Sequence, residues 1–148
     1  MREIVRAFFQ SEEIAVEDAE DGKVLRVAFE GENGRFLGLV RVHEGTSVLA
    51  FYTLCPIEVP PEKMADAAEL VARLNNGHVL GNLELDVDDG TMRFKTSVDV
   101  EGAELTEDLV ANVVYANVAS LDQMLPAITA VVVKGTRPRD AALAIAGP

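Results

Sequence analysis

The sequence predicts an α+β domain in which helices pack on an antiparallel sheet of about five strands. Three observations support this prediction: short segments with apolar residues at alternate positions, longer segments with apolar residues every three or four positions, and turn sequences between consecutive strands. The resulting order is helix, three strands, helix, two strands, helix. With 148 residues, 49% of them hydrophobic, the chain can bury a substantial core, and residues 1–148 are expected to form a single domain.

The opening residues predict a short amphipathic helix. Ile4, Val5, Phe8 and Phe9 fall at helical spacing, with polar residues between them. Such an apolar face must be covered. Two alternatives remain: the helix covers an edge or face of its own sheet, or it contacts a partner or a second copy.

Three strands joined by short turns form a predicted meander. An acidic segment, residues 17–22, precedes them and is expected to be a turn or an exposed link. The apolar positions of the first strand alternate, at Leu25, Val27 and Phe29. Asn33-Gly34 marks a reversal into a strand from about residue 35 to 44. Residues 48–55 are apolar on both sides, as expected for a central strand.

The Pro60-Pro61 pair predicts the start of a second helix, with Pro61 suited to its first position. Gly77 is expected to end this helix in the left-handed conformation. The predicted buried stripe comprises Met64, Ala67, Ala68, Val71 and Leu74.

A hairpin follows, and its register can be predicted. The apolar residues of the two strands must share a face, so Val87 is expected opposite Met92 and Leu85 opposite Phe94. Residues 88–91 then form the loop.

The exposed side of this hairpin supports the same register. It places Glu84 across from Lys95 and Asp86 across from Arg93, so that opposite charges meet. Gly90 supplies the positive φ that such a loop requires.

A long apolar stripe predicts a final helix. Thr106 is the expected N-cap, and Pro126 is expected to kink or restart the helix, with Asp122 as a second cap. The β-branched run 131–133 is compatible with a strand, but continuity of the stripe favours helix. The stripe comprises Val110, Val114, Val118, Leu121, Leu125, Ile128 and Val132. The tail, residues 135–148, carries no strong signal and is expected to be loosely packed or to add a helical turn or two.

Charge and composition limit the partners and the compartment. A net charge of -12 argues against nucleic acid and anionic membranes, which both require clustered Lys and Arg. The N-terminus lacks the features of a signal peptide, and the apolar stretch 124–133 is too short to span a bilayer. The lone Cys55 indicates a small buried side chain in a reducing compartment. We therefore expect a cytoplasmic protein.

No motif in the sequence predicts catalysis, a metal site or a cofactor. His43 and His78 lack a nucleophile in a recognisable motif and are expected to be surface histidines. The acidic hairpin loop resembles a calcium loop only superficially, because Leu85 and Val87 stand where its first and third ligands would be. We expect a protein that is not an enzyme.

The segment LNNGHVLGNLELDVDDGTMRFKTSVDVEGAELTEDLV, residues 74–110, resembles the YbjN family of bacterial sensory transduction regulators. The shared pattern is Leu74-Asn75 at a helix end, a strand at 81–86, the turn glycine Gly90, and Leu105-Thr106 at a helix start. The resemblance implies a fold similar to type III secretion chaperones, which are commonly dimeric and bind proteins. The family carries no agreed catalytic residues, so none is transferred.

These observations favour a non-catalytic protein-binding module, chaperone-like or regulatory, acting as a homodimer on a protein client. A helix face or an exposed sheet edge would capture an extended client segment. The candidate partner-binding residues are Ile4, Phe8, Phe9, Val110, Val114 and Val118. The alternative is a small-ligand sensor with a pocket between the sheet and the long helix, near Tyr52 and Tyr115. An enzyme based on acids or His43 is the least favoured.

Overall fold

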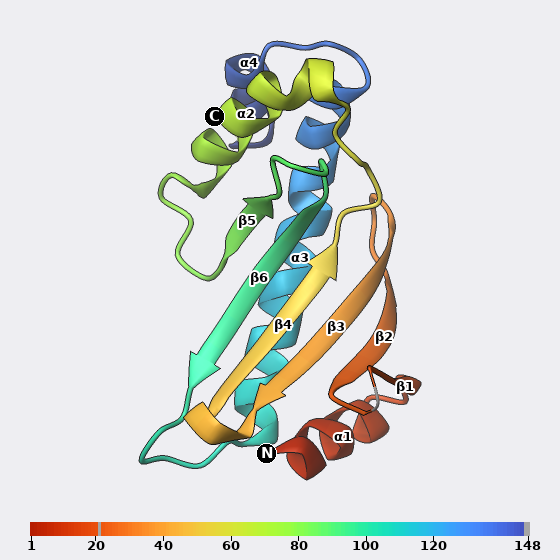
Figure 1. Cartoon of the computed structure of the whole chain (residues 1–148), viewed down its shortest axis with the longest axis vertical. Helices are drawn as coiled ribbons and strands as arrows, with labels where there is room; N and C mark the ends of the chain where they lie inside the picture. The colour runs from red at the N-terminus through yellow and green to blue at the C-terminus, as the bar shows by residue number, and fades with distance from the viewer. Residues whose placement is uncertain (21, 147–148) are drawn as a thin grey trace.

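The computed structural model of the chain describes residues 1–20 and 22–146. Asp21 of the predicted acidic link and residues 147–148 of the predicted tail lie outside the described residues. The elements are α1 (Arg2–Ser11), β1 (Val16–Ala19), β2 (Val24–Glu30), β3 (Arg35–His43), β4 (Val48–Leu54), α2 (Met64–Asn75), β5 (Asn82–Leu85), β6 (Met92–Asp99), α3 (Glu107–Val132) and α4 (Pro138–Ala146). The strands form one antiparallel sheet in the order β1-β2-β3-β4-β6-β5, which confirms the predicted fold class (Figure 1).

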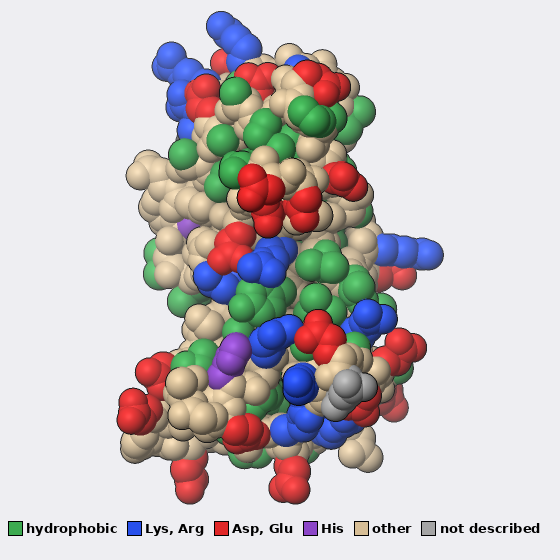
Figure 2. All heavy atoms as spheres, in the orientation of Figure 1, with side chains coloured by type: hydrophobic (Ala, Val, Ile, Leu, Met, Phe, Trp, Pro, Cys, Tyr) green, Lys and Arg blue, Asp and Glu red, His purple; other side chains and the backbone are tan. Residues whose placement is uncertain are grey.

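All helices of the described residues lie on one face of the sheet or at its ends. Figure 1 shows α3 running behind the sheet, α1 at one end, and α2 and α4 together at the other. Apolar side chains from α1 and α3 fill the core against β2, β3 and β4, and those from α2, α3 and α4 fill it at the other end. The opposite face of the sheet carries no helix in this part of the chain, and Figure 2 views the molecule from that side.

The N-terminal helix covers its own domain, which is the first of the two predicted alternatives. Val5, Phe8 and Phe9 are buried and pack with Leu25 and Phe51 of the sheet. Phe8 and Phe9 meet edge to face, with ring centroids 5.0 Å apart. No second copy is needed to cover this face.

The sheet has a sixth strand that the sequence did not predict. The acidic segment forms β1, in which Glu17 pairs with Arg26 and Ala19 with Val24 of β2. Edge strands are often short and charged, which hides them from a search for alternating apolar residues. The prediction of a link for residues 17–19 was therefore wrong.

Helix α2 begins after a 3-10 turn, Pro61–Lys63, with the proline at its first position as predicted. Its buried stripe includes Leu70, whereas Ala68, which the prediction placed there, is exposed. Leu70 removes more apolar area from water than Ala68, so the helix is oriented to bury the larger side chain. Gly77 has a φ of +80°, as predicted.

The hairpin of β5 and β6 pairs in a register two residues away from the predicted one. Leu85 lies opposite Met92 and Leu83 opposite Phe94, while Val87 is in the loop and 62% exposed. A slip of two residues preserves the side-chain face, so the buried face is as predicted although the pairs were wrong.

Hydrogen bonds within the loop explain this shorter ladder. The Asp86 N–H donates to the Thr91 carbonyl at 2.9 Å, and the Gly90 N–H donates to the Asp86 carbonyl at 2.8 Å. The Asp86 carboxylate also accepts from the Asp88 N–H at 2.9 Å. These local bonds make Asp86 the first loop residue, an outcome typical of Asp in turns. Gly90 has the predicted positive φ, +80°.

Helix α3 is continuous across Pro126, so the predicted restart of the helix was wrong. Thr106 is the N-cap as predicted, since its hydroxyl accepts from the Leu109 N–H at 3.2 Å. The helix runs to Val132, which confirms helix over strand for most of the run 131–133. No helix of the described residues is both long and apolar enough to cross a membrane.

Asn117 fixes α3 on the middle of the sheet. Its side chain is fully buried, and Nδ2 donates to the carbonyls of Phe51 in β4 at 2.9 Å and Phe94 in β6 at 3.0 Å.

Much of the predicted loose tail is helical and packed, because Ala141 of α4 is buried against α2 and α3.

Candidate functional site

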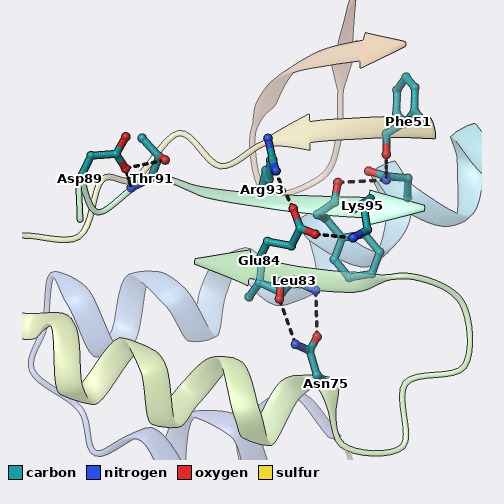
Figure 3. Close-up of polar contacts among 10 residues, drawn as sticks. Phe51, Asn75, Leu83, Glu84, Asp89, Thr91, Arg93 and Lys95 are labelled. Atoms are coloured by element: carbon teal, nitrogen blue, oxygen red, sulfur yellow. Dashed lines mark hydrogen bonds and ion pairs between the residues drawn. The ribbon is translucent and has the colours of Figure 1, made fainter. Parts of the chain in front are cut away.

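One edge of the sheet is blocked by a side chain. The Asn75 side chain, at the end of α2, bonds to Leu83 of the edge strand β5. Nδ2 donates to the Leu83 carbonyl at 2.9 Å, and Oδ1 accepts from the Leu83 N–H at 2.8 Å (Figure 3). The amide therefore bonds Leu83 as a neighbouring strand would. Because exposed edges invite pairing with other chains, Asn75 limits strand addition here.

The opposite edge is only partly covered. β1 pairs with β2 from Val24 to Val27 and no further. The chain before Val16 turns away toward α1, where the Ile14 N–H donates to the Phe9 carbonyl at 2.9 Å. On the side away from β3, residues 28–30 of β2 therefore have no strand beside them in the described part of the chain (Figure 1).

Two residues of this unpaired segment direct their backbone groups outward. The Gly31 N–H donates to the Gly34 carbonyl at 2.8 Å across the β2–β3 turn. In an antiparallel ladder alternate residues bond to the same neighbour, so the odd-numbered residues of β2 face β3. Ala28 and Glu30 therefore point N–H and C=O away from β3. The Ala28 N–H faces the Ala15 carbonyl at the end of the β1 ladder, so the Ala28 carbonyl and both groups of Glu30 are left for an added strand.

A surface groove of about 870 Å³ lies between the end of β2 and α3. We call it the edge groove. It is lined by the turn residues Glu30, Gly31, Glu32 and Asn33, by Tyr115, Val118, Ala119, Asp122 and Gln123 of α3, and by Ile145 of α4. Val118 and Phe29 are partly buried against the core beneath it. The edge groove therefore offers apolar contact beside unpaired backbone.

The edge groove is negatively charged. Three acids line it, Glu30, Glu32 and Asp122, and none of its lining residues is Lys or Arg. Glu30 is loosely paired with Arg35 at 3.4 Å, and both side chains are largely exposed. A binding partner must therefore tolerate or neutralise negative charge.

Asp122 fixes the turn at the end of β2 to α3. Its carboxylate accepts from the backbone N–H of Asn33 at 2.8 Å and of Glu32 at 3.0 Å. In return Asn33 Nδ2 donates to the Asp122 carbonyl at 3.0 Å. Pro126, four residues later, has no N–H to give that carbonyl, so Asn33 supplies the missing donor. Asp122 was predicted to cap a second helix; its carboxylate caps a turn between strands instead.

A glycine permits this close contact. A Cβ added to Gly31 would lie 2.3 Å from Asp122 Oδ1, which is shorter than any real contact. Gly31 is therefore required where the turn meets α3. The contact between the β2–β3 turn and Asp122 thus positions the turn against α3, and the edge groove is already formed in this conformation.

Tyr115 links α3 to the N-terminal helix at the far end of the groove. Its hydroxyl donates to the Glu12 carboxylate, and its ring meets Phe8 edge to face at 5.9 Å. The hydrogen bond to Glu12, with burial and the charge of Glu12, raises the pKa of Tyr115 to about 12. Tyr115 therefore stays protonated and uncharged at neutral pH.

Most of the predicted partner-binding residues lie inside the fold. Phe8, Phe9, Val110 and Val114 are buried and contribute to the core between α1, α3 and the sheet. The other two predicted residues, Ile4 and Val118, are half-buried. In this conformation the four buried residues offer no surface to a partner. Binding of a partner by these four residues stays a prediction, and it would require α1 to leave the sheet. Only Val118 lies in the edge groove.

The two tyrosines of the sensor alternative are on opposite sides of the sheet. Tyr52 lies on the uncovered face, where the Arg93 guanidinium is 4.7 Å from its ring centroid. Tyr115 lies on α3, behind the other face. The space between sheet and helix is filled by buried side chains such as Val110 and Leu121. One pocket containing both tyrosines is therefore excluded.

A serine and a histidine come together, but not as a catalytic pair. Ser120 Oγ lies 3.2 Å from His78 Nε2 and donates its own hydrogen to the Ala116 carbonyl at 2.6 Å. The bond to Ala116 uses the hydrogen that the hydroxyl would have to give to an activating base. His43 is exposed as predicted, whereas His78 is half-buried with its ring 5.2 Å from that of Phe94.

The cysteine and the carboxylates show no reactive arrangement. Burial raises the pKa of the Cys55 thiol despite a hydrogen bond from the Ile57 backbone, so little thiolate forms at neutral pH. Within residues 1–20 and 22–146, no group of three or more His, Cys, Asp or Glu side chains is placed to hold a metal ion.

A match to a protein family supports the resemblance seen in the sequence. A model of the YbjN family, described as "Putative bacterial sensory transduction regulator", matches residues 1–130. The search among curated proteins finds no match.

Two solved structures share the fold. One is described as "Crystal structure of YbjN, a putative transcription regulator from E. coli"; its TM-score is 0.62 at 14% identity, covering 82% of this chain and 86% of that chain. The other is described as "Structure of the HopA1-SchA Chaperone-Effector Complex"; its TM-score is 0.50 at 16% identity, covering 80% of this chain and 87% of that chain. At these identities the similarity concerns the fold.

Proposed function

The chain belongs to the YbjN family, whose description is that of a regulator and not of an enzyme, and we propose that it acts as a non-catalytic protein-binding module, chaperone-like or regulatory. Residues 1–148 would act as one domain, and two copies would associate as a homodimer. The similarity of fold to a chain of a chaperone–effector complex supports a protein as the partner. The partner itself would be an extended segment of a client protein.

The observation that carries this proposal is the unpaired end of β2 beside the edge groove. An extended peptide adds to an open strand edge through main-chain hydrogen bonds, and pockets beside the edge select its side chains. Ala28 and Glu30 would bond the added strand, while its inward side chains would contact Val118 and Phe29. The blocked edge at Leu83 leaves β2 as the more accessible of the two edges.

The charge of the groove defines the chemistry of the client. Glu32 and Glu30 lie at its rim, and the chain as a whole carries a charge of -12. A segment that alternates apolar and basic residues would place apolar side chains toward α3 and basic ones near these acids. The net charge would also speed the approach of a basic segment at low salt.

The test is a binding measurement with two labelled peptides on the full chain. A peptide of alternating valine and lysine should bind at least about tenfold more tightly than one of alternating valine and glutamate. Equal affinity for both peptides, or no binding of either, would refute the proposal.

Two variants locate the site. Glu30→Pro removes an outward N–H beyond the β1 ladder while leaving the bonds to β3, and proline is tolerated at strand edges; it should weaken binding of the valine–lysine peptide. The double substitution Glu30→Lys with Glu32→Lys should weaken it by about tenfold or more. The double substitution Glu101→Lys with Glu104→Lys is the matched control, since these exposed acids lie in the β6–α3 loop, and it should leave the affinity nearly unchanged. Equal loss in the control would place the site elsewhere.

A further inference from the structure

The uncovered face of the sheet, which we call the open face, has an apolar centre on its two middle strands. In the ladder Leu39 pairs with Tyr52, and Leu37 pairs with Leu54, so these four side chains adjoin on β3 and β4. Leu37 is 40% exposed and the other three are half-buried. Figure 2 shows hydrophobic side chains exposed among charged ones on this face.

The charges around this centre are balanced. The basic side chains of the open face are Arg26, Arg35, Arg41, Arg93 and Lys95, and the acidic ones are Glu17, Glu20, Glu30, Glu84 and Asp99. Four of the five cations form an ion pair with one of these acids, and Arg26 lies opposite Glu17 in the ladder. Figure 3 shows Glu84 between Arg93 and Lys95.

This balance contrasts with the remainder of the molecule. The chain has 13 basic and 25 acidic residues, so eight basic and twenty acidic residues remain outside the open face, and they carry the whole net charge of -12. Two copies therefore repel each other over most of their surfaces but not over this face. The edge groove, with its acids, is a poor site for a second copy.

The apolar centre also matches itself. Consider a two-fold axis that runs parallel to the strands and passes between β3 and β4, with two sheets packed face to face. Leu39 of each copy then lies over Tyr52 of the other, and Leu37 over Leu54. Sheets pack in this aligned manner in β-sandwiches, and an isologous contact requires such a self-complementary surface.

We infer that the open face is the interface between two copies of this chain. The inference rests on the proposed homodimer and names the surface that forms it. Four central strands span about 20 Å and the nine residues of β3 about 30 Å, so the face measures roughly 600 Å² in plane, close to the ~800 Å² that each partner of a stable complex commonly buries.

The test is the mass of the full chain, measured by sedimentation equilibrium between about 1 and 100 µM, the range in which weak and moderate dimers dissociate. The wild type should approach twice the chain mass of 15.9 kDa. Leu37→Lys should raise the dissociation constant by at least about tenfold, because symmetry places the change twice in the interface. Leu54→Lys should do the same.

Leu143→Lys is the matched control, because Leu143 is 61% exposed on α4, away from the open face. It should leave the dissociation constant unchanged, although it changes the net charge by the same amount, from -12 to -11, as Leu37→Lys. Circular dichroism and melting temperature establish that each variant is folded. A monomeric wild type, a Leu37→Lys dimer as tight as the wild type, or equal weakening by Leu143→Lys would overturn the inference.

The same samples separate this inference from the client-binding proposal. A monomeric Leu37→Lys variant should still bind the valine–lysine peptide, since the edge groove shares only Glu30 with the open face and Leu37 does not line it. A monomeric wild type that binds this peptide would refute the dimer interface alone, and a dimer that binds no peptide would refute the groove alone. A monomeric wild type that binds the valine–glutamate peptide through Leu37 would show an acidic partner on the open face and would also overturn the inference.

Discussion

The contact between the β2–β3 turn and α3 makes a sharp prediction about Asn33. Removal of its side chain by Asn33→Ala should destabilise the protein, because the Asp122 carbonyl would then lose its donor. The donor is needed only because Pro126 lacks an N–H. In a Pro126→Ala background the helix itself supplies an N–H to that carbonyl, so Asn33→Ala should cost less there.

The expected magnitude follows from the exposure of the bond. An unsatisfied buried acceptor costs about 1–3 kcal/mol, and this bond, at 3.0 Å, is exposed to solvent. We therefore expect Asn33→Ala to cost about 1 kcal/mol in the wild-type background. The cost should fall to a few tenths of a kcal/mol in the Pro126→Ala background, which gives a coupling of roughly 0.5–1 kcal/mol.

Urea unfolding of the four proteins, followed by far-ultraviolet circular dichroism, measures this coupling. Differences between midpoints should be compared at a common slope, because extrapolated free energies carry errors of about 10–15%. Asn76→Ala, which removes an exposed amide at the end of α2, should have little effect in either background. An equal cost for Asn33→Ala with and without Pro126 would refute the assignment of Asn33 as the replacement donor.

Three further predictions concern single side chains. Burial acts to raise the pKa of Glu84, but hydrogen bonds and charges from its two basic neighbours outweigh burial and lower the pKa below its ordinary value. The stabilisation from Glu84 is therefore present above its pKa in the unfolded chain and is lost as the pH falls through its pKa in the folded protein. Glu84→Gln should cost less stability at pH ~2 than at pH ~7. Tyr52→Phe leaves Tyr115 as the one tyrosine of the chain, and its ultraviolet titration should show a pKa of about 12. When Glu12→Gln is added to this variant, the pKa of Tyr115 should move toward its ordinary value. Thr53 has a fully buried hydroxyl without a partner among the described residues, so Thr53→Val should raise the midpoint of urea unfolding by an amount equivalent to about 1 kcal/mol or less; a lower midpoint would show that the hydroxyl is bonded.

The sequence was most informative where one local rule controls the structure. The Thr106 cap, the helix start at Pro61 and the left-handed Gly77 each depend on a few neighbouring residues, and all three are as predicted. The α+β class follows from apolar periodicity and turn spacing over many residues. The family was indicated by the resemblance of residues 74–110 and is confirmed by the match of the family model. These features need no knowledge of distant contacts.

The predictions that were wrong depend on competition between neighbouring or distant groups. The hairpin register was chosen from apolar pairing, but the turn bonds of Asp86 and Gly90 outweighed the pairing of Val87. Pro126 was expected to interrupt α3, but Asn33, which is 89 residues from Asp122 in sequence, donates to the carbonyl that the proline leaves without a donor, and the helix continues. No local pattern reports such a partner.

The sequence suggested which kind of element could bind a partner, but it did not locate that element. An exposed sheet edge was among the expected binding elements, yet nothing in the sequence locates it, because it depends on where β1 stops pairing with β2. The amphipathic face of α1 was offered as a partner surface, whereas Phe8 and Phe9 complete the core. A strongly apolar face in a small domain is more readily covered by the chain itself than left for a partner.

The placement of charge gives the two proposed surfaces separate partners. The acids at the edge groove, Glu30 and Glu32, favour a basic client and disfavour a second acidic copy. The open face pairs its cations with acids inside one chain, so a second copy can approach it without net repulsion. α3 lies behind the sheet and the open face in front of it (Figure 1), and of the residues that line the edge groove only Glu30 belongs to the open face. A dimer formed through the open face would therefore leave most of the edge groove of each copy accessible to a client. The excess of acid over the rest of the surface would thus restrict the proposed self-association to one face.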